Sequence, residues 1–407
     1  MHPCGLVLLF SVIIITGCSA SDTGPHSFSV TEENGIPVAV TSGGPRYDTP
    51  PFGLEEVLRI HQNEDQPASL LRSPTDLAPG PDGTLIVVER NIGRAVVYDA
   101  DGEFIRELGG RGQGPGEFES IQDMRISGDT LSFYDWRQYR LTVLRIDGTL
   151  IEVLPTRDYG RIQGIDMLPG RILALRDSDM RFGRNHIYQS SSIVVINEAT
   201  GDTLSSLKSD DVEISPNDSP GGGTGTTVAI EVMPFTAEAS TMVIPGDRIL
   251  VTAGVSPEID LYDLSGRLLR SIRIELPARQ VTPEMKDEYW AGAEMRLAHF
   301  NRELDPTVKA DTPFPTHAGW WAEVIADETG YLWMRDVTSN PAGWPGIPSR
   351  FFVLDPEGCY LGVSTLPAMT GRIENGRYYT IVRDLETGLY EPVVYRIVPL
   401  VSDLTYP

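Results

Sequence analysis

The chain has 407 residues, a hydrophobic fraction of 41% and a formal net charge of −24. By the usual relation between chain length and number of domains, this length permits two or three domains. Closed rings of repeats, however, run long as single domains, so we expect one. The sequence contains no run of Lys or Arg, and together with the negative charge this argues against nucleic acid and anionic lipid headgroups as partners.

The first residues have the order of an export signal. Residues 6–15, LVLLFSVIII, are too few to span a bilayer but enough for the apolar part of a signal peptide. The following ITGC (15–18) resembles the lipobox of bacterial lipoproteins, although the preceding MHPCG lacks the usual Lys or Arg. The resemblance implies a signal peptide over 1–17 and a lipidated Cys18 that anchors the chain to a membrane of the bacterial cell envelope. Ser19 favours the outer membrane.

The segment after the signal peptide is short and polar before it forms a hairpin. Residues 18–27 are small and polar and are expected to be a flexible tether. The region 28–53 is read as an N-terminal hairpin and lead-in, because the Asn-Gly pair at 34–35 is a strong type I′ turn signal between alternating runs. Once Cys4 is removed and Cys18 lipidated, Cys359 is left alone, so we expect no internal disulfide.

One phrase recurs six times in the rest of the chain: a hydrophobic run, a tight Gly turn, a second run, and then a third run that often ends in an Asp-Gly turn. The first halves are LAPGPDGTLIVVE (77–89), MRISGDTLSFYDW (124–136), IDMLPGRILALRD (165–177), MVIPGDRILVTAG (242–254), VIADETGYLWMRD (324–336) and GRIENGRYYTIVRD (371–384). Five second halves follow, for example VVYDADGEFIREL (96–108) and FFVLDPEGCYLGVSTL (351–366). A period of about 40–50 residues with four short strands per unit is typical of a β-propeller. The sequence therefore predicts an all-β fold, a six-bladed β-propeller with four-stranded blades over 54–401.

The sixth unit lacks an outer strand, because few residues follow PVVYRIVPL (392–400). LEEVLRIHQ (54–62) has the alternation of an outermost strand and belongs to no blade of its own. We therefore expect the N-terminal strand 54–62 to complete the last blade beside 392–400, which leaves no long sheet edge exposed. An open sandwich is the alternative, but sandwiches rarely keep one turn type at one place.

Four long connections fall on one face of the predicted ring, the top face, where strand four of one blade joins strand one of the next and strand two joins strand three. They are 177–192, 208–240, 275–322 and 336–350. Long loops in a compact fold are usually functional or disordered. Within one of them, Thr282 and Pro283 can start a helix, and apolar residues recur at helical spacing to Leu304. We expect a helical insertion near 282–304 that lies over the mouth of the ring as a lid.

The stretch LGGRGQGPGEFES (108–120) resembles a phrase typical of six-bladed, NHL-like β-propeller lipoproteins of bacterial envelopes. The turns YDADG (98–102) and LDPEG (354–358), and the strand GYLWMRD (330–336), fit the same family. The resemblance spans 28 to 400 and implies the fold and an envelope location, but no activity, because propellers host many unrelated functions.

All six tryptophans are expected near the top face: Trp136, Trp290, Trp320, Trp321, Trp333 and Trp344. Trp333 lies within a strand and is expected in the core, whereas the others lie in or beside loops, where aromatic faces stack on sugars or apolar groups. The candidate ligand-binding residues are Trp290, Trp320, Trp321, Trp344 and, for acid/base work, His317. The alternative is that these rings pack the lid onto the ring.

Three acidic residues begin innermost strands and are candidates for a metal site. Counting back from the turn of each unit gives Asp76, Asp123 and Glu323, whose carboxylates are expected to point into the central channel. Three oxygen donors on one axis suit Ca²⁺. The alternative is that each acid bonds to turn amides or to an Arg of a neighbouring blade, such as Arg125.

Two functions remain open from the sequence. The first is a lipid-anchored recognition module that binds a carbohydrate, peptide or protein ligand at its top face. The second is a metal-assisted hydrolase or lyase of the lactonase-like propeller type, with Ca²⁺ held by the channel acids. The inner strands of blades three and four offer Gly164 or Ile165 and Thr241 at the matching positions, so that constellation is incomplete. No hydrolase, metalloprotease or phosphate-loop motif is present, which favours binding over catalysis.

Overall fold

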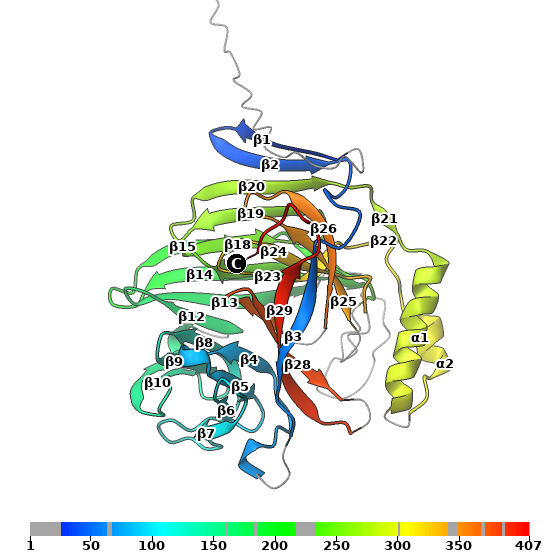
Figure 1. The fold of residues 1–407 in the computed structure, drawn as a ribbon. Helices are drawn as coiled ribbons and strands as arrows, with labels where there is room; N and C mark the ends of the chain where they lie inside the picture. The colour runs from blue at the N-terminus through cyan, green and yellow to red at the C-terminus, as the bar shows by residue number, and fades with distance from the viewer. Residues whose placement is uncertain are drawn as a thin grey trace, which may run out of the picture.

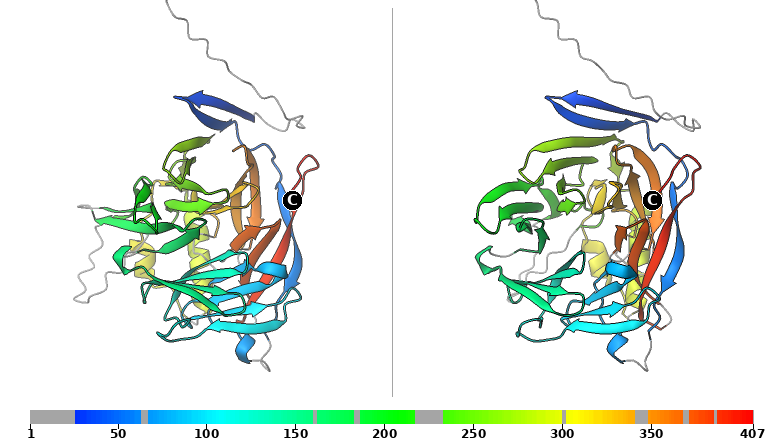
Figure 2. Two further views of the ribbon diagram at one scale, coloured as in Figure 1. Left: turned by 90° about the vertical axis from the view of Figure 1, so that its left-hand side faces the viewer. Right: turned by 60° about the vertical axis from the view of Figure 1, so that its left-hand side comes forward.

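The computed structural model describes residues 26–62, 67–159, 162–182, 186–216, 233–299, 302–340, 348–367, 371–384 and 387–406. Six of their sheets are arranged as blades around a central axis (Figures 1 and 2). Each blade runs from its first strand, next to the axis, to its fourth at the rim. The six-bladed ring predicted from the repeats is confirmed.

The blades follow the chain in order. Blade 1 has β4 (Asp76–Pro79), β5 (Leu85–Glu89), β6 (Arg94–Tyr98) and β7 (Phe104–Gly109). Blade 2 has β8 (Ile121–Ser127), β9 (Thr130–Asp135), β10 (Arg140–Arg145) and β11 (Leu150–Pro155). Blade 3 has β12 (Gly164–Leu168), β13 (Ile172–Phe182), β14 (His186–Asn197) and β15 (Thr203–Lys208), and β16 (Val212–Pro216) pairs with β14.

The second half of the ring is built in the same way. Blade 4 has β17 (Ser240–Ile244), β18 (Arg248–Thr252), β19 (Glu258–Asp263) and β20 (Leu268–Glu275). Blade 5 has β23 (Trp321–Ala326), β24 (Leu332–Asp336), β25 (Ser349–Leu354) and β26 (Tyr360–Leu366). Blade 6 has β27 (Gly371–Glu374), β28 (Arg377–Arg383), β29 (Tyr390–Pro399) and β3 (Phe52–Arg59). Short 3-10 turns lie at Pro67–Ser69, Pro81–Gly83 and Arg157–Tyr159.

The hydrophobic pattern of a strand follows its place in the blade. The second strand of blade 1, LIVVE, is buried along its whole length, because neighbouring blades cover both of its faces. The fourth strand, FIRELG, lies at the rim and is mostly exposed. Continuous apolar runs are typical of strands that are covered on both faces, and the core of the ring lies in the layers between blades.

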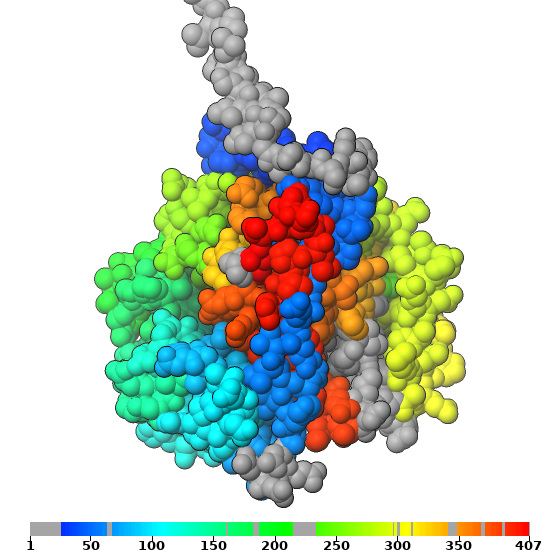
Figure 3. All heavy atoms as spheres, viewed as in Figure 1, coloured from blue at the N-terminus to red at the C-terminus, as the bar shows by residue number. Residues whose placement is uncertain are grey.

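The N-terminal strand closes the ring as predicted. β3 pairs antiparallel with β29, with Arg59 opposite Val393 and Phe52 opposite Pro399. Figure 3 shows this strand as a blue band beside the red C-terminal residues. The fourth strand of blade 6 therefore comes from the N-terminal part of the chain, and the hydrogen bonds between β3 and β29 close the ring.

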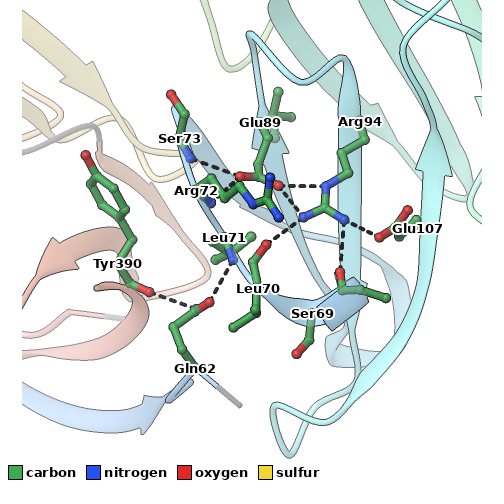
Figure 4. Close-up of polar contacts among 12 residues, drawn as sticks. Gln62, Ser69, Leu70, Leu71, Arg72, Ser73, Glu89, Arg94, Glu107 and Tyr390 are labelled. Atoms are coloured by element: carbon green, nitrogen blue, oxygen red, sulfur yellow. Dashed lines mark hydrogen bonds and ion pairs between the residues drawn. The ribbon is translucent and has the colours of Figure 1, made fainter. Parts of the chain in front are cut away.

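A buried carboxylate fixes the segment that joins the closing strand to blade 1 (Figure 4). Glu89, at the end of β5, is fully buried and accepts hydrogen bonds from the backbone amides of Arg72 and Ser73 at 2.5 and 2.9 Å. Arg94 donates to the same carboxylate from Nε at 2.6 Å and also pairs with Glu107 on β7. The carboxylate thus links the incoming loop to the second and third strands of blade 1.

The same segment is tied back to blade 6 by one amide side chain (Figure 4). Nε2 of Gln62 donates to the carbonyl oxygen of Tyr390 at 2.8 Å, and its Oε1 accepts from the amide of Leu71 at 2.7 Å. Because Gln62 lies three residues after the end of β3, it bridges the last blade and the loop that enters the first.

Acidic residues at the ends of second strands recur, as the repeated phrase suggests. In blade 2, Oδ2 of Asp135 accepts from the amides of Glu119 and Ser120 at 2.6 and 3.2 Å. In blade 5, Asp336 accepts from Arg279 at 2.6 Å and from Arg350 at 3.2 Å. Each acid therefore organises the top-face loops around its own blade.

The N-terminal hairpin is formed and extends a blade. β1 (Ser27–Glu33) and β2 (Ile36–Ser42) pair antiparallel, and Asn34 and Gly35 both have positive φ, as a type I′ turn requires. β2 then pairs in parallel with β20, so that blade 4 has six strands (Figure 1). The sequence indicated the hairpin but not this pairing, because nothing in the repeat marks the outer edge of blade 4 as its partner.

The helical insertion lies between blades 4 and 5. α1 (Pro283–His299) begins after Thr282, whose Oγ1 accepts from the amide of Met285 at 3.3 Å, and α2 (Pro306–Asp311) follows. Two short strands, β21 (Arg279–Gln280) and β22 (His317–Ala318), pair at the base of the insertion. The helices stand at one face of the ring (Figures 1 and 2). The expected connection 177–192 is mostly strand, since β13 and β14 continue together beyond the blade.

Candidate functional site

The six first strands surround a central channel with a volume of about 800 Å³. Asp76, Asp123 and Glu323, the acids singled out from the sequence, all line it. Asp166 on β12 lines it as well and was missed. The count back from the turn pointed to Gly164 or Ile165 in that blade, two residues or one before the acid.

Arginines pair with the three channel acids singled out from the sequence. Asp76 on β4 pairs with Arg372 on β27 at 3.3 Å. Asp123 on β8 pairs with Arg176 of the next blade. Glu323 pairs within its own blade with Arg335 at 3.3 Å. Two of these three pairs cross from one blade to another and therefore lock adjacent blades together.

Asp166 lies at the centre of the densest charge cluster of the channel. It pairs with Arg125 of blade 2 and, at 3.2 Å, with Arg176 of its own blade. Burial alone would raise the pKa of Asp166, but the two guanidinium groups outweigh it and hold that pKa below the ordinary value. The pKa of Glu323 is raised instead, because burial outweighs its single partner, Arg335.

The donor set of the channel does not fit the calcium site that the sequence suggested. Asp76, Asp123 and Glu323 each face a guanidinium group, and the first two also accept the amide hydrogen of the following residue, at 2.8 and 3.0 Å. Over the described part of the chain, no three His, Cys, Asp or Glu side chains come together in a group that could hold a metal ion. The alternative reading, that these acids bond to amides and to arginines, describes the channel.

The tryptophans expected to face a ligand are mostly buried. Trp320 and Trp321 are 7% and 1% exposed and pack in the core between blades 4 and 5. Nε1 of Trp321 donates to Oγ1 of Thr252 at 3.1 Å, and Arg279 stacks over Trp320. Trp333 is fully buried, as expected. Trp320 and Trp321 serve as packing groups, which is the alternative left open by the sequence.

The remaining candidates do not gather at the channel either. Trp290 on α1 is buried against Tyr289 and Phe314. His317 is exposed on β22 but does not line the channel. Trp344 lies outside the described residues. Since no residue of α1 lines the channel, the expected convergence of tryptophans, lid and carboxylates on one pocket is not seen in the described structure.

A second cavity, of about 580 Å³, opens on the top face over blades 1 to 3. We call it the Trp136 pocket, after the large aromatic that is 40% exposed beside it. Its lining includes the side chains of Arg90, Asn91, Gln122, Trp136, Arg137 and Gln163. Arg90 and Gln122 line the channel as well, so the two cavities adjoin.

The loop that presents Trp136 is held from below. Asp135 is fully buried, and its Oδ1 accepts from the amides of Arg137 and Gln138 at 3.0 and 3.1 Å. Nε1 of Trp136 donates to Oγ of Ser120 at 3.1 Å, and Arg137 lies over the indole ring. The ring is thus oriented by its own blade while much of its surface stays accessible.

The glycine-rich loop at 108–120 supports the same site. Arg140 donates to the carbonyl oxygens of Gln113 and Gly114 at 3.1 and 2.7 Å, and Nε2 of Gln138 to that of Gly112 at 2.9 Å. Glu117 accepts from the amide of Gly114 at 2.8 Å. The loop carbonyls and amides are used within the protein, so this loop is a structural support.

Glycines in blade 1 make room for the end of that loop. Phe118 is fully buried against the turn at Gly93, whose φ is +74°. A Cβ at Gly93 would lie 2.3 Å from the carbonyl oxygen of Phe118, closer than real contacts allow. The glycine is therefore needed both for its backbone conformation and for the close approach.

Comparisons with known proteins agree with this fold. A family model described as a six-bladed β-propeller, DUF5128, matches residues 80–152. The structure is similar to that of an exported protein from Bacteroides fragilis, with 9% identity and a TM-score of 0.51 over 88% of this chain and 99% of that chain. It is also similar to a member of the DUF4221 family from Bacteroides vulgatus, with 12% identity and a TM-score of 0.50 over 86% of this chain and 99% of that chain. The chain is a six-bladed β-propeller.

Other comparisons add little about function. A virginiamycin B lyase from Staphylococcus aureus has a TM-score of 0.39 at 12% identity over 85% of this chain and all of that chain, which is too slight a likeness to inform an activity. No curated protein matches the sequence. Within the described residues, neither helix has the length and apolar character needed to cross a bilayer.

Proposed function

We propose that this protein is a binding module that holds a polar ligand, a sugar or a segment of peptide or protein, in the Trp136 pocket on the top face of its ring. The observation that carries the proposal is the exposure of Trp136. The tryptophans at 290, 320, 321 and 333 are at most 7% exposed, whereas Trp136 is 40% exposed and is held in one orientation by Ser120.

The composition of the pocket suits such a ligand. A volume of about 580 Å³ is within the usual range for small-molecule sites, which run from about 300 to 1,000 Å³. An indole face offers dispersion contact to the C–H face of a sugar or to an apolar side chain. The amide groups of Asn91, Gln122 and Gln163 both donate and accept hydrogen bonds, as hydroxyl groups and peptide units require.

The proposed location is the bacterial cell envelope, where the protein would be an NHL-like lipoprotein anchored through Cys18. Support comes from the lipobox order of residues 15–18 and from a neighbour in fold that is described as exported. The mature chain should fractionate with membranes, and Cys18→Ser behind a cleavable signal sequence should release it. Membrane association that survives this substitution would contradict the anchor.

The binding proposal is tested with arrays of glycans and peptides. Trp136→Ala should weaken capture of the ligands found by about fivefold or more, because one stacked aromatic contributes about 1 kcal/mol or more. Met295→Ala is the matched control, since Met295 is a large apolar residue, 57% exposed, on α1. If Met295→Ala weakens binding and Trp136→Ala does not, the ligand is held at the helical insertion and the proposed site is wrong.

The second candidate from the sequence, a calcium-assisted hydrolase or lyase, is not favoured by the channel. Its acids are engaged by Arg372, Arg176 and Arg335, so a cation would have to displace a guanidinium group at each of them. The positive charge of those arginines opposes a divalent ion at the same positions.

A further inference from the structure

The Trp136 pocket carries a charge opposite to that of the protein as a whole. The chain has a net charge of −24, yet the pocket is lined by two arginines, Arg90 and Arg137, and by no carboxylate among the described residues. A positive pocket on a strongly acidic protein is a local feature, since the overall field would repel anions rather than attract them.

Arg90 is the arginine with the least satisfied guanidinium group at this site. Its Nε is buried without a hydrogen-bond partner, and its NH2 reaches only the carbonyl oxygen of Gln122, at 3.5 Å. In the described structure no carboxylate lies within 4.0 Å of it, whereas the other arginines that line the channel (Arg125, Arg176 and Arg372) each pair with at least one. Asp76 of blade 1 is already paired with Arg372, and Asp123 of blade 2 with Arg176.

Arg137 adds a second positive charge beside the aromatic ring. Its guanidinium lies over the indole of Trp136, with Cζ 5.4 Å from the ring centroid, and it forms no ion pair among the described residues. Asp135, directly below, is fully buried and accepts hydrogen bonds from both amides of the turn. The carboxylate of Asp135 is therefore occupied by hydrogen bonds within the loop.

We infer that the ligand of this pocket is an acidic saccharide, whose ring stacks on Trp136 and whose acid group pairs with Arg90. This inference rests on the proposed function and specifies its ligand. A planar guanidinium binds a carboxylate or sulfate through two parallel hydrogen bonds, which are stronger than bonds between neutral groups. The amides of Gln122 and Gln163 serve the neighbouring hydroxyl groups, which donate and accept as amides do.

The test is isothermal titration with pairs of ligands that differ only in the acid group. The probes are α-1,4-linked trigalacturonate, its methyl ester, a sulfated galactose oligosaccharide with its desulfated form, and hexaglutamate. The protein variants are Arg90→Gln, Trp136→Ala and a control, Arg145→Gln, which removes an exposed arginine at the far end of β10 in blade 2.

An acidic sugar should bind about tenfold or more tightly than its neutral form, and Arg90→Gln should abolish this preference, because a hydrogen bond to a charged group is worth at least that factor. Trp136→Ala should weaken the acidic and neutral forms alike, and Arg145→Gln should change neither. Binding of only the carboxylate or only the sulfate form identifies which acid is recognised, and either result supports the inference.

Three results would overturn it. Equal binding of the acidic and neutral sugars, still dependent on Trp136, would mean a neutral ligand and would leave the proposed function standing. Binding of hexaglutamate alone, through Arg90, would replace the saccharide by an acidic peptide. If no probe binds and Trp136→Ala also leaves every array signal unchanged, both the inference and the proposed function fail.

Discussion

The carboxylate of Glu89 allows a quantitative test of how the ring is closed. This side chain is fully buried and accepts two backbone amides and Arg94, whereas Glu107 pairs with the same arginine but is 38% exposed. Glu89→Gln removes a buried charge from its partners, which costs about 3–5 kcal/mol. Glu107→Gln removes a partly solvated charge, which costs about 0–1 kcal/mol.

These free energies convert into melting temperatures that can be separated. With about 2.1 cal/mol/K per residue and 407 residues, the entropy of unfolding is about 0.8 kcal/mol/K, so Glu89→Gln should lower Tm by about 4–6 °C and Glu107→Gln by about 1 °C or less. Differential scanning calorimetry of the two variants beside the parent protein measures both shifts. Equal shifts would refute the reasoning, because they would mean that burial at this junction adds nothing to the strength of the pair.

Three further predictions follow from the packing and the charges. Burial opposes the charge of Asp166, but its arginines hold its pKa below the ordinary value of 3.8. The pairing of Asp166 therefore stabilises the fold above about pH 4, and this stabilisation is lost as the pH falls through the lowered pKa. Tm of Asp166→Asn, measured from about pH 3 to 7, should fall less steeply in acid than Tm of the parent. Trp321→Ala should cost about 3–5 kcal/mol and Trp136→Ala under about 1 kcal/mol in urea unfolding, and similar losses would contradict their different burial. Deletion of β3 should abolish the cooperative unfolding seen by circular dichroism, since blade 6 loses its fourth strand, whereas deletion of residues 26–44 should leave a ring that folds at lower Tm.

The fold was accessible from the sequence because each unit carries the same local signals in the same order. The turn glycines and the apolar second strands recur with each blade, and an acid ends the second strand in several of them, as at Glu89 and Asp135. The closing strand was also predictable, since its alternation fitted the one blade that lacked an outer strand. These features are local, and a periodic sequence repeats them.

The site was less accessible because it depends on contacts between distant residues. Asp76 and Arg372 are 296 positions apart, and no local pattern shows that they meet in the channel. Whether a loop tryptophan is exposed depends on what packs over it: Phe352 and Arg279 cover Trp320, whereas Trp136 lines an open pocket. A signal for Trp136 was present, since it directly follows the buried acid of a second strand.

Hydrogen exchange measured by mass spectrometry, with and without a ligand taken from the arrays, tests the central claim most directly. If the ligand binds in the Trp136 pocket, the amides of the top-face turns near Arg90, Gln122 and Trp136 should exchange more slowly in its presence, because the bound ligand covers them and restrains the turns. Exchange at the turns of the opposite face, and in α1, should not change. Protection confined to α1 and the segment around His317, with none at Trp136, would contradict the account.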